Sequence, residues 1–150
     1  MAVANGSIET NCMNAVDTNV LVYAIDRDEA IKQAKANELL ARLSHSSETV
    51  LLWQVASEFL AVLRRWQDAK RMTADEAGMA FRITRGMFPL RLPRKRILKT
   101  STDLRSRFHL SHWDSMLLAA CKDARVDRLY SEDMDPGTDY DGVRIENPFA

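Results

Sequence analysis

Short apolar segments alternate with longer amphipathic segments along this chain, and the alternation constrains the fold more than any other feature. Apolar or small side chains recur on one side of each amphipathic segment at helical spacing. The predicted helices cover residues 29–43, 56–70, 73–88, 95–108 and 111–124. The predicted strands cover residues 48–55, 89–93, 126–133 and 141–149. Because strands alternate with helices, we expect an α/β fold with a mainly parallel central sheet.

The position of the first strand is open. Residues 20–25, "VLVYAI", have strand-like composition, and by propensity alone they form the first strand, with Asp17 in the preceding loop. In the alternative, the strand covers residues 14–16 and the apolar run begins a helix. Asp17 then lies at the carboxyl end of the strand, where ligands bind in open α/β sheets. Local physical chemistry alone does not decide between the two.

Composition excludes several classes of protein. The 150 residues are 46% hydrophobic and 28% charged, which is typical of one soluble globular domain. No apolar run approaches the roughly 20 residues of a membrane-spanning helix, and residues 1–12 lack the pattern of a secretory signal. We therefore expect a cytoplasmic protein. Cys12 and Cys121 belong to no Cys/His spacing, which argues against a zinc site and a disulfide framework.

Charge is unevenly distributed along the chain. The formal net charge is zero, but residues 61–110 carry 13 Lys and Arg against 4 Asp and Glu. The rest of the chain is correspondingly acidic. Such asymmetry can mark a polyanion-binding surface beside a cation-binding site, or charges that pair across the fold on solvated helix faces.

Several acidic residues fall at predicted strand ends or helix starts. Glu58 flanks the apolar face of its helix, where an ionised side chain needs a cation or a hydrogen-bond partner. Asp114 lies in the first turn of a later helix, and Asp133 and Asp135 follow the strand-like "RLY". Capping, turn chemistry or the helix dipole could explain each acid singly, but together with Asp17 they occupy positions that converge in α/β folds. Clustered carboxylates usually bind a hard divalent cation, and such sites hydrolyse phosphodiesters.

These acids and their surroundings resemble a known family. The segments are "VDTNVLVYA" with Asp17, "ASEF" with Glu58, "HWDSMLLAA" with Asp114, "YSEDMDPG" with Asp133, and the closing "VRIENPF". In order and spacing they resemble the PIN-domain ribonucleases, particularly the VapC-type toxins of bacterial toxin-antitoxin pairs, over residues 14–149. The resemblance implies a PIN-like three-layer α/β/α fold in which Asp17 ends the first strand and the following apolar run opens a helix.

The resemblance also implies a site and a reaction. In that family three acids and a fourth, less uniform one bind Mg²⁺ or Mn²⁺ and cut RNA, leaving 5′-phosphate and 3′-hydroxyl ends. The places of these acids correspond to Asp17, Glu58, Asp114 and Asp133. Asp135 also suits the fourth place, but Asp133 is nearer the predicted strand. The polar residues expected to steady carboxylates or water are Thr18, Asn19 and Ser131.

RNA, an antitoxin and a second copy of the chain are the expected partners. The candidates for holding the RNA backbone are Arg64, Arg65, Lys70, Arg82, Arg85, Arg94, Lys95 and Arg96. The helices 56–70 and 73–88 carry apolar side chains on more than one face, which favours a homodimer. VapC-type toxins commonly dimerise and are silenced by an antitoxin. The three tryptophans are expected to pack in the core or between helices rather than to act as base-stacking platforms; they are Trp53, Trp66 and Trp113.

Two other functions and one boundary stay open. A haloacid-dehalogenase-like phosphatase also starts with an Asp at a strand end, but it requires a second Asp two positions on, where this chain has Asn19. The other alternative is a catalytically silent PIN-like module that only binds RNA or protein. We expect residues 14–150 to form a single nuclease domain and residues 1–13 to form an extension of uncertain status.

Overall fold

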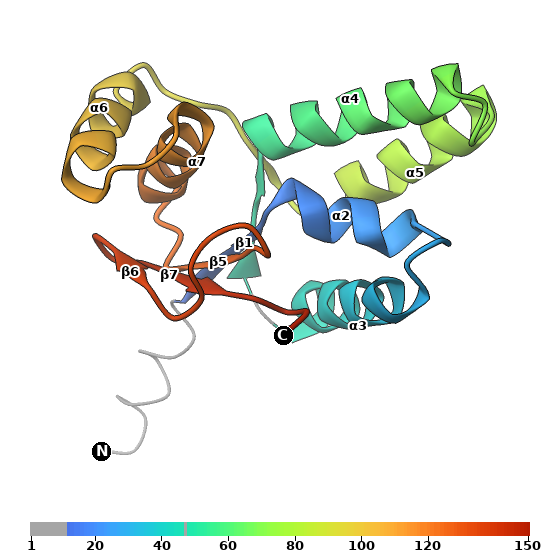
Figure 1. The fold of residues 1–150 in the computed structure, drawn as a ribbon, viewed down its shortest axis with the longest axis horizontal. Coiled ribbons are helices and arrows are strands. Elements are labelled where there is room, and N and C mark those ends of the chain that lie inside the picture. The colour runs from blue at the N-terminus through green and yellow to red at the C-terminus, as the bar shows by residue number, and fades with distance from the viewer. Residues whose placement is uncertain (1–11, 47) are drawn as a thin grey trace.

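The computed structural model describes residues 12–46 and 48–150 (Figure 1). The strands are β1 (Met13–Val16), β2 (Glu48–Thr49), β3 (Leu51–Leu52), β4 (Leu90–Arg91), β5 (Arg128–Tyr130), β6 (Asp139–Tyr140) and β7 (Val143–Glu146). The helices are α2 (Thr18–Ile25), α3 (Ala30–Ser46), α4 (Trp53–Asp68), α5 (Ala74–Met87), α6 (Ile97–Phe108) and α7 (His112–Asp123).

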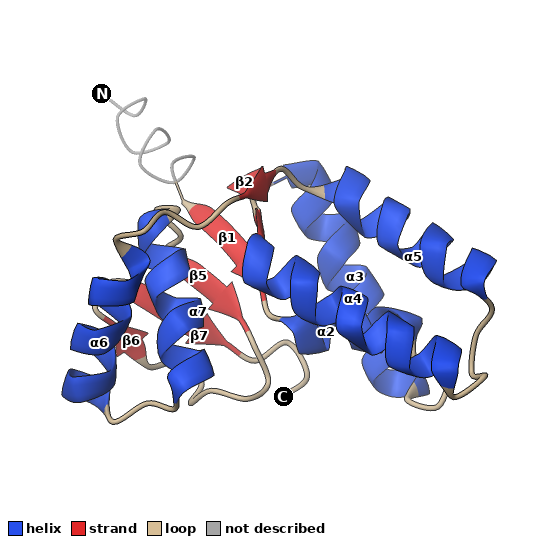
Figure 2. Cartoon of the chain, turned by 90° about the horizontal axis from the view of Figure 1, so that it is seen from above, coloured by secondary structure: helices blue, strands red, loops and turns tan. Residues whose placement is uncertain are grey.

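The central sheet has the strand order β2-β1-β5-β7-β6. All neighbouring strands in it are parallel except the edge strand β6, which is antiparallel to β7. Strands β3 and β4 form a separate parallel pair. Figure 2 shows α6 and α7 on one side of the central sheet and α2, α3, α4 and α5 on the other. The predicted three-layer α/β/α fold with a mainly parallel sheet is confirmed.

The chain leaves the first strand at Asp17 and turns directly into a helix. The Asp17 N–H donates to the Tyr130 carbonyl at 2.8 Å, which is the last contact between β1 and the neighbouring strand β5. The Asp17 carboxylate then caps α2 by accepting from the Thr18 N–H at 2.7 Å. Val20 and Leu21 are buried on α2, so the apolar run is helical. The reading based on strand propensity alone is wrong, because capping and burial outweigh it.

The predicted strand over residues 48–55 is wrong in part. It divides into β2, which pairs with β1, and β3, which pairs with β4. Helix α4 begins at Trp53, three residues earlier than predicted. Val55 is fully buried on this helix, and an apolar run of this length does not distinguish a buried strand from a buried helix turn.

The start of α5 is set by a local cap. Thr73 and Glu76 form the reciprocal capping box expected from their spacing, and α5 starts directly after Thr73.

Strand β6 lies within the segment predicted as a loop. It pairs with β7 through a turn at Asp141 and Gly142, both with positive φ (54° and 99°), a backbone that favours glycine at the second position.

The hydrophobic core fills the space between the sheet and both groups of helices. Its fully buried side chains include Phe59 on α4, Leu118 on α7, Leu129 on β5 and Ile145 on β7. Among the described residues, no helix has the length and apolar character needed to cross a membrane. The predicted extension lies almost wholly outside the described residues, and β1 begins at Met13.

Candidate active site

Asp17 lies where the order of strands in the sheet reverses. It follows β1, and Ser131 follows the neighbouring parallel strand β5, so both occupy the carboxyl edge of the sheet. From β1 the chain passes first to β2 on one side and later to β5 on the other, which makes the β1–β5 boundary the switch point where α/β sheets bind ligands. The Ser131 hydroxyl donates to Asp17 Oδ2 at 2.7 Å, and the Thr18 N–H holds Oδ1.

The environment of Asp17 disfavours its negative charge. Only 8% of the residue is exposed, and this burial raises the pKa of the carboxyl group to about 6. The charges of Asp133 and Glu58 raise the pKa further, whereas the hydrogen bonds from Ser131 and Thr18 lower it. Asp17 is therefore a buried carboxylate with acidic neighbours whose ionised form a nearby cation would stabilise.

Glu58 reaches the site from the second turn of α4. Its Oε2 accepts from the Thr18 hydroxyl at 2.8 Å, so Thr18 bonds to two carboxylates, through its backbone to Asp17 and through its side chain to Glu58. Glu58 Oε1 accepts from Gln54 Nε2 at 3.1 Å. Sequence reasoning missed Gln54, although its spacing four residues before Glu58 on one helix is a signal for such a pair.

Asp133 lies in the same network. Asn19 Nδ2 donates to Asp133 Oδ2 at 3.0 Å, and the Asp133 N–H donates to the Ser131 hydroxyl at 3.2 Å. Ser131 thus links Asp17 to Asp133. The carboxylate of Asp135 is exposed and makes no hydrogen bond or ion pair within the described part of the chain. The hydrogen-bond geometry favours Asp133 over Asp135 as a member of this group.

Asp114 lies at the start of α7, on the opposite side of the sheet from Glu58. Its N–H donates to the Ser111 hydroxyl that caps the helix, as its spacing predicted. No hydrogen bond of a described residue joins its carboxylate to Asp17. The two helices nevertheless meet beside it, because Gln54 Nε2 also donates to the Trp113 carbonyl at 3.4 Å. Asp114 also raises the pKa of Tyr140, after burial and Asp135.

The candidate ligands suit a hard divalent cation, although their side chains do not lie close together in the structure. Within residues 12–46 and 48–150, no three acidic, His or Cys side chains are close enough together to form a ready-made metal site. The candidate ligands are all carboxylate oxygens, which Mg²⁺ and Mn²⁺ prefer. The raised pKa of Asp17 is one feature that a cation would relieve. The buried Oδ1 of Asn19, which accepts no hydrogen bond from any described residue, is a second that a cation or its water would relieve.

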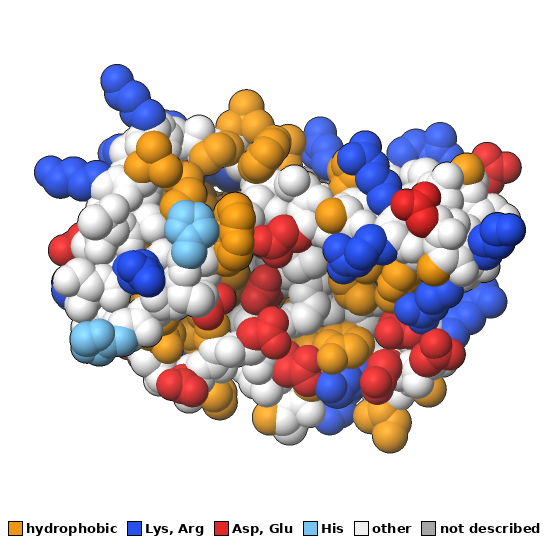
Figure 3. All heavy atoms as spheres, turned by 45° about the horizontal axis from the view of Figure 1, so that its top comes forward, with side chains coloured by type: hydrophobic (Ala, Val, Ile, Leu, Met, Phe, Trp, Pro, Cys, Tyr) orange, Lys and Arg blue, Asp and Glu red, His pale blue; other side chains and the backbone are white. Residues whose placement is uncertain are grey.

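Acidic and basic side chains occupy different parts of one face. Figure 3 shows acidic side chains along a hollow in the middle of this face and Lys and Arg side chains over the α4–α5 part. All eight basic residues singled out in the sequence are exposed. Arg94 and Arg96 both pair with Asp123 at the end of α7, so their charge is partly neutralised. The other six are exposed as well, and they include the basic side chains of α4 and α5.

The tryptophan prediction is wrong for two of three residues. Trp53 is 49% exposed and Trp113 is 63% exposed, and both lie in the first turn of their helices, on the outer surface. The earlier start of α4 explains Trp53, because the helix face that packs on the core begins at Val55. Trp66 is half-buried and packs under the Arg71 guanidinium at 4.0 Å.

The closing "NPF" of the chain supports the loop that carries Ser131 and Asp133. Phe149 packs edge-on against Tyr23 of α2, with ring centroids 4.9 Å apart. Lys32 of α3 lies over the Tyr23 ring and forms an ion pair with Glu132. The terminal aromatic residue and this ion pair thereby tie the loop after β5 to the first two helices.

Comparisons with known proteins agree with this architecture. A family model described as the PIN domain matches residues 15–136. A search of curated protein sequences found no match. Similar solved structures include VapBC2 from Rickettsia felis bound to a promoter DNA fragment, with a TM-score of 0.69 and 13% identity over 90% of this chain and 98% of that one.

Two further solved structures share the fold. A toxin-antitoxin complex from Klebsiella pneumoniae has a TM-score of 0.62 and 18% identity over 90% of this chain and 97% of that one. VapC20 from Mycobacterium tuberculosis, a toxin that cleaves the sarcin-ricin loop, has a TM-score of 0.61 and 16% identity over 81% of this chain and 91% of that one. The family match covers most of the chain, and the protein therefore belongs to the PIN-domain family.

Proposed function

We propose that the protein is a metal-dependent endoribonuclease and the toxin of a toxin-antitoxin pair. The observation that carries the proposal is the buried Asp17 carboxylate at the switch point of the sheet, joined through Ser131 and Thr18 to Asp133 and Glu58. Membership of the PIN-domain family and the likeness to VapC-type structures support the same activity.

The residues proposed to hold Mg²⁺ or Mn²⁺ are Asp17, Glu58, Asp114 and Asp133. When bound, such a cation lowers the pKa of the attacking water and neutralises the negative charge that develops on the phosphate. The protein contributes orientation. Thr18 and Ser131 fix the Asp17 carboxylate, Gln54 and Thr18 fix Glu58, and Asn19 fixes Asp133. No histidine is required as a general base.

The basic surface is proposed to hold the RNA backbone. Arg64 and Arg65 on α4 and Arg82 and Arg85 on α5 are exposed. Figure 3 shows Lys and Arg side chains over the α4–α5 part of the face that carries the acidic hollow. Cations placed there would neutralise phosphates on either side of the cleaved bond, because phosphate contacts supply most of the affinity of such interfaces.

Cleavage with matched variants tests the activity. Wild-type protein should cut a mixed single-stranded RNA with Mn²⁺ and not with EDTA, and Asp17→Asn or Asp114→Asn should abolish cutting while the fold stays intact. Asp133→Asn and Asp135→Asn form a matched pair, and only the first should reduce cleavage strongly. Binding of RNA without cutting under any metal would support the silent module instead.

An antitoxin and a second copy of the chain are the proposed protein partners. The genomic reading frame next to this one should encode a small protein that binds the chain and blocks cleavage; binding with undiminished cleavage would contradict the inhibitory role.

Met79 and Ile83, one turn apart on α5, are 51% and 58% exposed and offer an apolar surface for pairing of two copies of the chain. Phe59 and Leu63 on α4 and Phe88, directly after α5, are also apolar but are buried in the core. Light scattering should show a dimer at tens of micromolar, estimated from ordinary interface affinities.

A further inference from the structure

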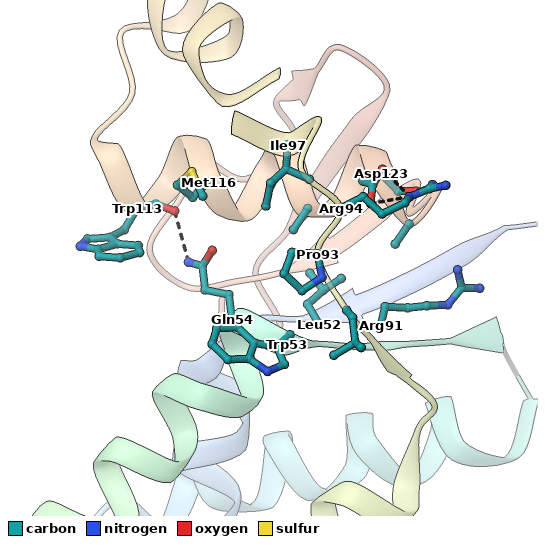
Figure 4. Close-up of a pocket in the computed structure, with 13 residues that line it drawn as sticks. Leu52, Trp53, Gln54, Arg91, Pro93, Arg94, Ile97, Trp113, Met116 and Asp123 are labelled. Atoms are coloured by element: carbon teal, nitrogen blue, oxygen red, sulfur yellow. Dashed lines mark hydrogen bonds and ion pairs between the residues drawn. The ribbon is translucent and has the colours of Figure 1, made fainter. Parts of the chain in front are cut away.

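Two kinds of structure hold the proposed metal ligands. Glu58 and Asp114 lie on the helices α4 and α7. Figure 4 shows that Gln54 of α4 bonds to the Trp113 carbonyl at the start of α7, which joins these two helices. Asp133 instead is exposed in the loop after β5. Because loops hold side chains less precisely than helices do, Asp133 depends on contacts that fix its loop.

Glu132, directly before Asp133, is joined to a lysine of another element. Its carboxylate forms an ion pair with Lys32 of α3, 100 positions earlier in the chain. The exposed fractions of the two side chains are 33% for Lys32 and 24% for Glu132, so water screens the pair less than it screens a fully exposed one. Because Lys32 neutralises it, Glu132 neither repels the Asp133 carboxylate strongly nor is free to bind a cation in its place.

Two aromatic rings fix the position of the lysine. Lys32 Nζ donates to the Tyr23 hydroxyl at 3.2 Å and lies 4.6 Å from the centre of the Tyr23 ring. The ring of Phe149, from the closing "NPF", has its centre 6.0 Å from the same nitrogen. Ring faces attract a cation, and more strongly where water is partly excluded. The closing motif, to which the proposed function gives no role, thus helps to hold the Lys32 ammonium beside Glu132.

The backbone transmits the position of Glu132 to the neighbouring residues. Ser131, on one side, is buried, donates to Asp17 and accepts from the Asp133 N–H. Met134, on the far side of Asp133, is 5% exposed. The ion pair of Glu132 ties the turn between these two buried residues to α3. Loss of the ion pair should therefore let the turn move, and the Asp133 carboxylate with it.

We propose that Lys32 is a positioning residue of the candidate active site, whose ion pair with Glu132 holds the loop that presents the Asp133 carboxylate. The inference rests on the proposed ribonuclease function and adds to it a residue outside the group of carboxylates. It also separates the roles of two adjacent acids, since Glu132 anchors the loop to α3 and Asp133 is left to bind the cation.

Two single variants of opposite charge test this role. Lys32→Met removes a positive charge and Glu132→Gln removes a negative one, so an effect of net charge on cation binding has opposite signs in the two. Loss of the ion pair has the same sign in both. Each variant should weaken Mn²⁺ binding to RNA-free protein by about 10-fold in calorimetry, the loss typical of a residue that supports a metal ligand. The double variant should lose no more than either single one, because the same contact is missing.

Loop order and catalysis give two further measurements. In metal-free protein, hydrogen exchange followed by NMR should be faster at the Asp133 N–H in both variants, since its bond to the Ser131 hydroxyl belongs to the same turn. At a Mn²⁺ concentration near the wild-type Kd, kcat for RNA cleavage should fall while KM for RNA stays the same. Lys32→Arg, which keeps the cation, should retain wild-type values in all three measurements.

Lys122→Met is the matched control. Lys122 of α7 pairs with Asp141 in the turn between β6 and β7, and this pair is exposed to a similar degree. The turn carries none of the proposed metal ligands. The control should therefore leave Mn²⁺ affinity and exchange at Asp133 unchanged, and a loss equal to that of Lys32→Met would overturn a specific role for Lys32.

Other outcomes separate this inference from the proposed function. Weaker Mn²⁺ binding in Glu132→Gln but not in Lys32→Met would identify Glu132 as a ligand and overturn the positioning role. If wild-type protein cuts RNA with Mn²⁺ and both variants match it in every measurement, the role of Lys32 is wrong while the proposed function stands. A wild-type protein that neither binds Mn²⁺ nor cuts RNA would overturn both.

Discussion

Replacing Asp17 by Asn should stabilise the metal-free protein at neutral pH. Burial and acidic neighbours raise the pKa of Asp17 from 3.8 to about 6 in the folded protein. Between these values the folded protein keeps a proton that the unfolded chain has released, so the free energy of unfolding falls as pH rises through this window. Above about pH 6 the free energy of unfolding has fallen by the equivalent of roughly two pKa units, or about 3 kcal/mol.

An Asn side chain avoids this loss, but its single amide oxygen can accept from only one of Ser131 and Thr18, which costs about 1 kcal/mol. The expected net gain at pH 7.5 is about 2 kcal/mol, or about 4–8 °C in Tm for a domain of this size. Below about pH 4 the gain should disappear. Urea unfolding in EDTA from pH 4 to 8 measures the difference, with the exposed Glu38→Gln on α3 as a control that should show no such pH dependence.

Metal should reverse the order of stability. Mn²⁺ should stabilise wild-type protein, because a ligand that binds only the folded state adds to its stability, and should stabilise Asp17→Asn much less. Two results would refute the argument that burial of an ionised Asp17 destabilises the fold. One is a difference in the free energy of unfolding between wild type and variant that is the same at every pH. The other is an Asp17→Asn variant that is less stable than wild type at pH 7.5.

Three further predictions follow from contacts around and away from the site. Gln54→Ala should reduce cleavage at saturating RNA while thermal unfolding changes little, because the variant frees Glu58 without opening the core; unchanged cleavage would contradict the positioning role. Thr73→Ala should lower the free energy of unfolding by about 1 kcal/mol through loss of the capping box and leave cleavage unchanged. Arg64→Gln with Arg65→Gln should reduce the slope of log affinity against log salt by about 1.4 for single-stranded RNA, as expected for two lost phosphate contacts; an unchanged slope would assign these residues to a solvated face.

The sequence predicted those features that follow from local chemistry. The amphipathic helices, the capping residues Thr73 and Ser111 and the parallel sheet were all readable, because periodicity and caps act over a few residues. The carboxylates at strand ends were readable for the same reason. The first strand was not, since residues 20–25 favour a strand by propensity. The turn at Asp17 that makes them helical depends on the neighbouring strand β5, whose Tyr130 carbonyl accepts from the Asp17 N–H.

Features that depend on packing between distant segments could not be predicted. The exposure of Trp53 and Trp113 follows from where two helices begin and from the loop that faces them, which periodicity does not specify. The bond from Asn19 to Asp133 spans 114 positions of the chain, so the sequence placed both residues near the site without pairing them. That bond also shows what Asn19 does at the position where a haloacid-dehalogenase-like phosphatase requires Asp.

The chemical form of the cut RNA ends tests the central claim most directly. If the carboxylates direct water at the phosphorus, as proposed for a bound divalent cation, the products carry 5′-phosphate and 3′-hydroxyl ends. A substrate with a single 2′-deoxyribose at the cleaved position should then be cut equally well, because the 2′-hydroxyl takes no part. Mass spectrometry of the fragments reads both results. Products with 2′,3′-cyclic phosphate ends, or loss of cleavage in the 2′-deoxy substrate, would contradict the account.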